Sequence, residues 1–246
     1  FAGVIKMGRT QMQDAVPTTL GRTFRAYQSF VKRDIRHLMS AAEEMKTLNL
    51  GGTAIGNTIN ATPEYLENIT AFVSEEVGIA FTQADDLFDA TQNVDGFVRF
   101  SAAIKTAAVN LSKMSNDLRL LSSGPKAGIG EINLPAKQNG SSIMPGKVNP
   151  VIPEVVSQVA FRVIGNDLTI TMAAESGQLE LNAFEPIIFH SLFESIDCLA
   201  HAVATLTVNC ITGIQSNEMA CYKHVEESAG IATHLCPTIG YQQASA

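Results

Sequence analysis

Apolar residues separated by alternating steps of three and four run through the middle of this sequence without a break. They are Phe97, Phe100, Ile104, Ala107, Leu111, Met114, Leu118 and Leu121. On an α-helix this spacing places all of these side chains on a single stripe. A stripe sustained over roughly three heptads is typical of a long helix that packs nearly parallel to another helix. The pattern therefore predicts a bundle of long helices.

Four further segments add helices to this prediction. Residues 192–210 repeat the same spacing, residues 24–45 form a broader stripe of the same period, and residues 151–164 are rich in Val and Ile. β-Branched residues also suit a strand, but Val151, Val155 and Val159 recur at every fourth position, which favours a helix. The sequence Thr-Pro-Glu at 62–64 has the residue types of an N-cap, a first-turn proline and a first-turn acid. It predicts a fifth helix that runs to about residue 81.

These patterns predict an all-α fold class, a bundle of about five long helices of roughly 20 to 30 residues each. A composition of 46% hydrophobic and 17% charged residues excludes a disordered chain. No run of about 18 uninterrupted apolar residues occurs, so no membrane is expected as a partner. Because seams this long commonly extend into a neighbouring subunit, an oligomer is expected.

The charge balance and the spacing of the metal-binding residue types narrow the class of function. The chain has 17 Lys and Arg against 24 Asp and Glu, a formal net charge of -7, so no nucleic acid partner is expected. The four cysteines lack a C-x-x-C spacing and the histidines lack H-E-x-x-H, so neither a disulfide nor a metal site is expected. His224 is predicted to be a surface or packing residue. Reduced thiols are typical of a cytoplasmic protein, which is the expected location.

Three stretches lack the helical period and are rich in Gly, Pro and small polar residues. They are residues 6–21, 50–62 and 122–150, and each is predicted to be irregular. Long loops inside compact domains are usually functional, which directs attention to the third stretch.

Residues 140–150 read Gly-Ser-Ser-Ile-Met-Pro-Gly-Lys-Val-Asn-Pro. Two hydroxyls, one ammonium and one amide thus lie beside the predicted helix start at Val151, where unpaired N–H groups carry partial positive charge. The combination predicts a site for a carboxylate, or for negative charge that grows in a transition state. A phosphate loop, G-x-x-x-x-G-K-[ST], fails on spacing, because the chain has Ser141 and Val148 at its first and last positions. A plain Ser/Pro/Gly linker remains the alternative.

The same residues 140–150 resemble the signature loop of the fumarase/aspartase superfamily. Residues 8–15, Gly-Arg-Thr-Gln-Met-Gln-Asp-Ala, are similar to the second active-site segment of that family, and residues 123–125 and 130–132 follow in the family's order. Within the superfamily the aspartase branch is the most similar, because Gln11 stands where fumarases carry His. The resemblance implies that residues 1–246 are the central helical-bundle domain of a longer protein, a fragment from which the N-terminal and C-terminal domains are absent.

The resemblance also implies a reaction, the reversible elimination of ammonia from L-aspartate to give fumarate through an enediolate-type intermediate. Ser141 corresponds to the general base that removes a proton from the carbon bearing the β-carboxylate. Ser142 corresponds to a group that holds this carboxylate, together with amides of the loop. Lys147 and Asn149 correspond to residues that anchor the α-carboxylate.

Outside the loop, the resemblance places Thr10 beside the α-carboxylate, Gln11 near the amino group, and Glu154 in a supporting role. It implies no cofactor and no metal. The implied partners are a small dicarboxylate, L-aspartate or fumarate, and further copies of the chain in a homotetramer with shared active sites.

Two alternatives stay open. One is a fumarate hydratase, in which water replaces ammonia as the leaving group. The other is a non-catalytic helical scaffold that keeps the fold, as the lens crystallins of this superfamily do. For the ammonia elimination that the resemblance implies, the chain alone is predicted to be inactive, because it holds only part of the implied active site.

Overall fold

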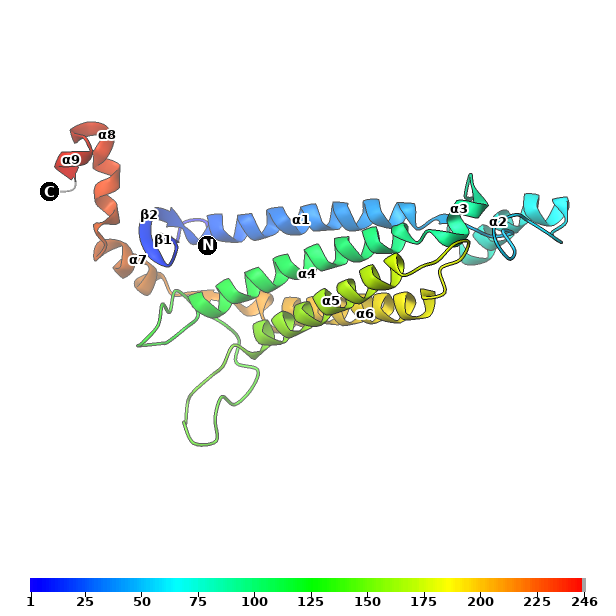
Figure 1. Cartoon of the computed structure of the whole chain (residues 1–246). Coiled ribbons are helices and arrows are strands. Elements are labelled where there is room, and N and C mark those ends of the chain that lie inside the picture. Colours follow the sequence, from blue (N-terminus) through cyan, green and yellow to red (C-terminus); the bar gives the residue numbers. More distant parts are fainter. Residues whose placement is uncertain (245–246) are drawn as a thin grey trace. The chain divides into compact units, whose positions relative to one another are not determined.

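The computed structural model describes residues 1–244 (Figure 1). Contacts divide the chain into two compact units. Unit 1 contains residues 1–31, 112–157 and the described residues from 203 onward, and unit 2 contains residues 32–111 and 158–202.

Four long helices dominate the secondary structure: α1 Leu20–Glu44, α4 Asp95–Leu121, α5 Val151–Glu175 and α6 Glu185–Asn209. They have 25 to 27 residues each, which confirms the predicted all-α class, and α5 confirms that the Val-rich segment is a helix. The predicted fifth helix is α2, Pro63–Val77, with 15 residues. It is shorter than expected because Gly78 adopts a left-handed φ of 71° and ends it. The Thr62 side chain caps its start by accepting a hydrogen bond from the amide of Tyr65.

In unit 2, neighbouring helices share buried polar contacts as well as apolar ones. Each of the following hydrogen bonds joins two of the long helices: Asn110 to Asp34 at 2.9 Å, Ser101 to Asp167 at 2.8 Å, and Asn166 to Ser195 at 3.1 Å. Around them Ile104, Val163, Ile170 and Ile188 are at most 3% exposed. Many side chains of the predicted apolar stripes therefore lie in the core of this unit, while others, such as Ile35 at 51% and Met39 at 64%, are exposed.

The short elements of unit 2 lie in the segment between α1 and α4. They are β3 Thr47–Leu48, which pairs in parallel with β4 Thr82–Gln83, and α3 Leu87–Gln92. The Asp86 side chain caps α3 by accepting hydrogen bonds from the amides of Phe88 and Asp89.

Unit 1 contains a β-hairpin that the sequence did not predict. Strands β1, Ile5–Thr10, and β2, Gln13–Thr19, pair antiparallel, so the expectation of an irregular stretch at 6–21 is wrong. Gln11 and Met12 form the two-residue turn with φ of 51° and 67°. Such a turn normally has Asn-Gly or Asp-Gly, and the absence of that signal explains why the hairpin was missed.

Unit 1 also contains several short elements. The stretch 122–150 contains β5, Ile132–Asn133, which pairs antiparallel with β6, Gln215–Ser216. After α6 come η1 Ile211–Gly213, α7 Glu218–Glu226, η2 Ala229–Leu235, α8 Cys236–Ile239 and α9 Tyr241–Ala244.

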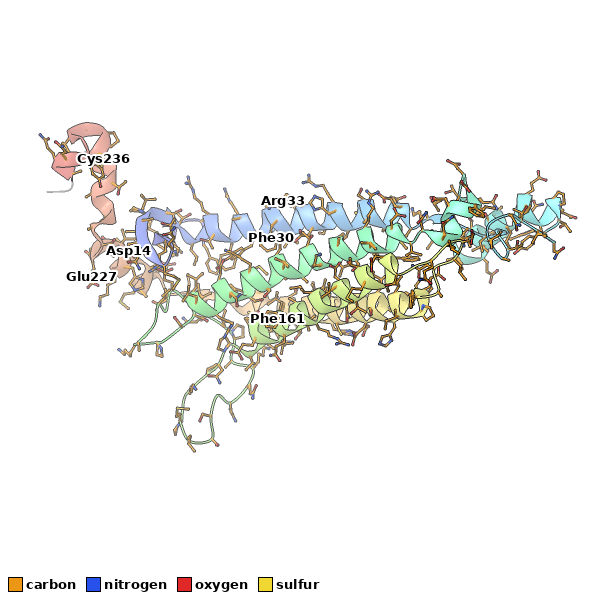
Figure 2. The ribbon with its side chains drawn as sticks, in the orientation of Figure 1. Asp14, Phe30, Arg33, Phe161, Glu227 and Cys236 are labelled. Carbon is orange, nitrogen blue, oxygen red and sulfur yellow. The ribbon has the colours of Figure 1, made fainter. Side chains whose placement is uncertain are left out.

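Several large apolar side chains on α5 and α6 are exposed, among them Phe161, which is labelled in Figure 2. The exposed fractions are 64% for Phe161, 61% for Leu168, 59% for Met172 and 65% for Phe193. By length and composition alone, the stretch 185–213 could also cross a membrane. Polar residues interrupt its apolar runs, in agreement with the sequence analysis. A core helix of a soluble protein passes the same test, so the finding is weak evidence for a span.

Candidate functional site

The predicted anion-binding loop folds around a cavity of its own. Residues 136–142 and 145–148 line this cavity, whose volume is about 890 Å³. At its neck, the Gly140 amide donates a hydrogen bond to the Lys147 carbonyl at 2.9 Å, and the Asn149 side-chain amide donates to the Gly140 carbonyl at 3.2 Å. A Cβ on Gly140 would lie 2.1 Å from the Lys147 oxygen, so only glycine permits this closure.

The Ser141 hydroxyl has an environment suited to holding negative charge. Its Oγ accepts hydrogen bonds from the backbone amides of Ile143 and Met144, each at 3.2 Å. Two amide dipoles that converge on one oxygen stabilise its deprotonated form relative to the neutral hydroxyl. Ser142, the next residue, is exposed and lines the same cavity.

Lys147 lines the same cavity as the two serines. Its side chain is exposed, and within residues 1–244 it takes part in no hydrogen bond or ion pair. Its ammonium is therefore available to an anionic ligand. Together with Asn149 at the neck, the loop brings four of the predicted site residues, Ser141, Ser142, Lys147 and Asn149, into one short segment.

The predicted supporting residue, Glu154, lies in the first turn of α5. Its carboxylate pairs with the Arg119 guanidinium, in the last turn of α4, at 3.6 Å. This contact links the helix that follows the loop to α4, within unit 1. Its contribution to catalysis stays a prediction.

Thr10 and Gln11 lie at the tip of the β1–β2 hairpin and are exposed. Among the residues that the structure describes, neither side chain forms a hydrogen bond with the loop. The structure thus gathers the predicted residues into two groups, one on the hairpin and one on the loop, and does not join the two groups directly.

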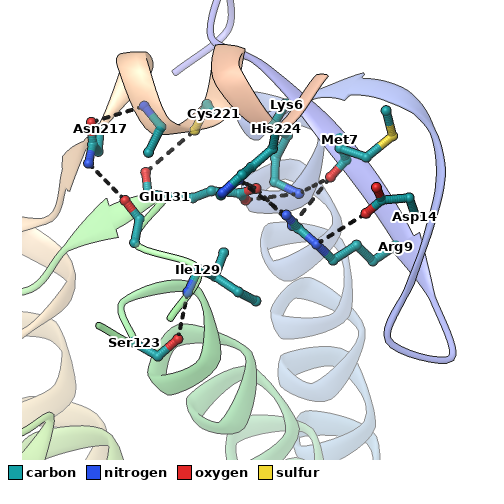
Figure 3. Close-up of polar contacts among 12 residues, drawn as sticks. Lys6, Met7, Arg9, Asp14, Ser123, Ile129, Glu131, Asn217, Cys221 and His224 are labelled. Carbon is teal, nitrogen blue, oxygen red and sulfur yellow. Dashed lines mark hydrogen bonds and ion pairs between the residues drawn. The ribbon is translucent and has the colours of Figure 1, made fainter. Parts of the chain in front are cut away.

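A cluster of ionisable side chains around the buried Glu131 connects β1 of the hairpin to the segment that leads into the loop (Figure 3). Glu131 has no exposed surface and directly precedes β5, after which the loop begins. One of its oxygens, Oε1, lies 2.7 Å from Arg9 Nη1 and 3.1 Å from His224 Nδ1. The other, Oε2, lies 3.2 Å from the Lys6 ammonium.

Sequence reasoning missed this cluster. In the sequence, Glu131 belongs only to a segment that resembles the family, and His224 has the pattern of a surface or packing residue. Their partners lie about a hundred residues or more away along the chain, and such long-range pairing leaves no local signal. Burial also raises the pKa of the nearby Cys221 thiol to about 11, so this thiol stays protonated at neutral pH.

Comparisons with known proteins agree with the family resemblance. A family model described as "Lyase" matches residues 1–165. The aspartate ammonia-lyase of Helicobacter pylori is 55% identical over 245 residues, which cover 100% of this chain and 52% of that protein. The aspartate ammonia-lyase of a Bacillus species is 50% identical, again with 52% of its length covered. The chain thus spans about half the length of the curated relatives it matches.

Solved structures with the same fold carry two different names. The crystal structure of a fumarate lyase:delta crystallin from Brucella melitensis matches 100% of this chain and 53% of its own, with a TM-score of 0.96 and 52% identity. A class II fumarase from Schistosoma mansoni has the same TM-score of 0.96 at 34% identity, over 98% of this chain and 54% of its own.

Proposed function

This chain belongs to the lyase family whose model covers residues 1–165, and on that premise we propose that the protein of which it forms part is an aspartate ammonia-lyase. The proposal includes a longer parent protein in which residues 1–246 are the central helical domain. Relatives about twice as long as this chain support it.

One observation supports the mechanism most directly. The Ser141 oxygen accepts hydrogen bonds from two backbone amides at 3.2 Å, in a cavity that Lys147 also lines. A serine is a weak base unless its oxyanion is stabilised, and converging amide dipoles and an ammonium supply that stabilisation. In the proposed reaction the Ser141 oxyanion takes the proton from the carbon beside the β-carboxylate. The electron pair of that C–H bond moves into the carboxylate and forms the enediolate.

The second step releases ammonia. The enediolate electrons return to form the carbon–carbon double bond, the C–N bond breaks with its electron pair on nitrogen, and fumarate remains. Ser142 and the loop amides hold the β-carboxylate as it gains charge, while Lys147 and Asn149 hold the α-carboxylate. Because Asn149 already donates to Gly140 across the neck, substrate contact by its amide is coupled to the closure of the loop.

Thr10 and Gln11 complete the proposed site from the hairpin, in an assembly with shared active sites. We propose a homotetramer, and the large exposed apolar side chains of α5 and α6 support it, because exposed apolar surface of this kind is typical of subunit contacts. Light scattering on the full-length protein tests this, and a monomer would contradict it. A cytoplasmic location is part of the same proposal.

The second candidate is a fumarate hydratase, favoured by the structural likeness to a class II fumarase at 34% identity. The higher identity to aspartate ammonia-lyases, 47% to 55%, and Gln11 in place of His favour ammonia as the leaving group. Turnover of L-aspartate and of L-malate by the full-length protein separates the two, and activity on malate alone would overturn our choice.

The Ser141→Ala variant of the full-length protein tests the mechanism itself. A general base contributes about 10²- to 10⁴-fold to a rate, so kcat for L-aspartate should fall by about that factor. Unchanged turnover would remove Ser141 from the mechanism, whereas a full-length protein that turns over neither L-aspartate nor L-malate would favour the non-catalytic scaffold. The isolated chain 1–246 is expected to release no ammonia, because the groups of the remaining domains are missing.

A further inference from the structure

We propose that Glu131 is a positioning residue, which fixes the hairpin bearing Thr10 and Gln11 to the stem of the loop bearing Ser141. The proposal rests on the proposed function, in which both segments contribute to active sites. It concerns one contact within unit 1, between Glu131 and the basic residues of the hairpin, which we call the joint. The proposal does not depend on which of the shared active sites each segment serves.

The first argument is that Glu131 is a fully buried carboxylate with three basic partners. Lys6 is itself only 5% exposed, and its ammonium lies 3.2 Å from Oε2 while it donates a 2.7 Å hydrogen bond to the Met7 carbonyl. Arg9 and His224 converge on Oε1. A buried charge is costly unless it is paired, so loss of the carboxylate would leave the two cations of the hairpin strand without a buried counterion.

The second argument is the position of these partners along the chain. Lys6 and Arg9 lie on β1, and Arg9 directly precedes Thr10 and Gln11. Arg9 also reaches β2, where its Nε lies 3.9 Å from the Asp14 carboxylate. The Arg9 guanidinium, on β1, therefore contacts both Asp14 of β2 and Glu131. Because its planar fork has a fixed direction, we infer that it determines where the hairpin tip lies.

The third argument is that the backbone of Glu131 is held as firmly as its side chain. Its carbonyl accepts hydrogen bonds from the Asn217 amide at 2.8 Å and from the Cys221 thiol at 3.5 Å, and its own amide donates to the Leu121 carbonyl at 2.9 Å. The Asn217 side chain bonds the Gly130 carbonyl at 2.9 Å as well. The carboxylate is therefore a fixed reference point for the hairpin (Figure 3).

The joint acts on substrate binding more than on the loop itself. The loop closes its own neck through Gly140 and Lys147, so its internal geometry does not depend on Glu131. Among the described residues, the tip of the hairpin forms no hydrogen bond with the loop. The tip also carries the groups that are proposed to bind substrate. Displacement of the tip should therefore raise KM more than it lowers kcat.

The test uses Glu131→Gln in the full-length protein, a change that keeps the shape and removes the charge. A misplacement of about 1 Å costs on the order of 100-fold, so kcat/KM for L-aspartate should fall by about that factor, mainly through KM. If Glu131→Gln does not yield folded protein, Arg9→Lys replaces it, because it keeps the charge and loses the fork. An unchanged KM in the folded variant would overturn the proposal.

The matched control is Asp167→Asn. Asp167 is also a buried carboxylate, 6% exposed, with one ammonium partner, Lys105, and one hydroxyl donor, but it lies in unit 2. Its loss should lower the melting temperature while KM changes by less than about twofold. Equal changes of KM in both variants would show general destabilisation and overturn the proposal.

A double-mutant cycle with Gln11→Ala shows whether Glu131 acts through the hairpin. The effects on kcat/KM should be less than multiplicative, because a misplaced tip matters less once Gln11 has been truncated. Independent effects would overturn the proposal. If the wild-type protein converts L-malate and not L-aspartate, the proposed function fails, and the same comparison on L-malate still decides the role of Glu131.

Discussion

The neck of the loop provides the sharpest prediction about catalysis, through Gly140→Ala in the full-length protein. The added Cβ would lie 2.1 Å from the Lys147 oxygen and 2.6 Å from its carbonyl carbon. Both are backbone atoms, so no side-chain rotation relieves the clash. The neck has to open by more than about 1 Å before the Cβ reaches ordinary van der Waals contact.

That displacement breaks the 2.9 Å hydrogen bond between Gly140 and Lys147 and moves Ser141 away from its working position. A misplacement of this size costs on the order of 100-fold in rate, or about 2.7 kcal/mol of transition-state stabilisation. The melting temperature should hardly change, because the loop residues are mostly exposed and contribute little to the core.

The assay follows the formation of fumarate from L-aspartate by its ultraviolet absorbance, with thermal unfolding measured in parallel. Gly146→Ala in the same loop is the comparison, since no atom lies within 4 Å of its added Cβ and only its φ of +80° is unfavourable. Strain of about 1 kcal/mol there corresponds to roughly a fivefold loss. Wild-type activity in Gly140→Ala, or equal losses in both variants, would refute the steric reasoning.

Three further predictions concern stability, each measured by thermal or urea unfolding. Met12→Gly should stabilise the protein by up to about 1 kcal/mol, because it removes a side chain from a left-handed φ of 67°; a loss of stability would contradict this. Burial raises the pKa of the Asp34 carboxyl, which Asn110 only partly offsets, so stability from this group is present at low pH and is lost as pH rises. Asp34→Asn should therefore raise the unfolding midpoint at pH 7, and a gain that persists unchanged at low pH would argue against this cause. Tyr27→Phe should cost about 1 kcal/mol, because the buried hydroxyl donates a 3.0 Å hydrogen bond to Asp117; no change would indicate that water replaces the contact.

The sequence predicted the elements whose determinants are local. The stripe that includes Ile104, Leu111 and Leu118 has a period that only a helix satisfies, and these side chains are buried in the structure. Thr62 and Pro63 marked a helix start because capping depends on neighbouring residues alone. The loop at 140–150 was recognisable for the same reason, since its hydroxyls, ammonium and glycines are contiguous.

The sequence did not predict features that depend on distant residues, or on residues in backbone conformations that their type disfavours. The hairpin turn uses Gln11 and Met12 in left-handed conformations that their residue types disfavour, so no pattern marked it. The pairing of Glu131 with Arg9 and His224 exists only once β1, the loop stem and α7 have come together. The spacing also predicted a continuous apolar stripe on α6, but two of its positions, Ile196 at 40% and Val203 at 41%, are exposed.

Asn217 makes contacts in two directions, and together they can be followed by experiment. Its side chain caps α7 through the Ala220 amide, while its own amide bonds the Glu131 carbonyl at 2.8 Å. The first turn of α7 therefore cannot fray without releasing the peptide that precedes β5. Amide hydrogen exchange at Asn217 should accordingly report every opening of this joint, and its protection factor would measure how tightly an intact protein keeps the two segments together even when no substrate is present.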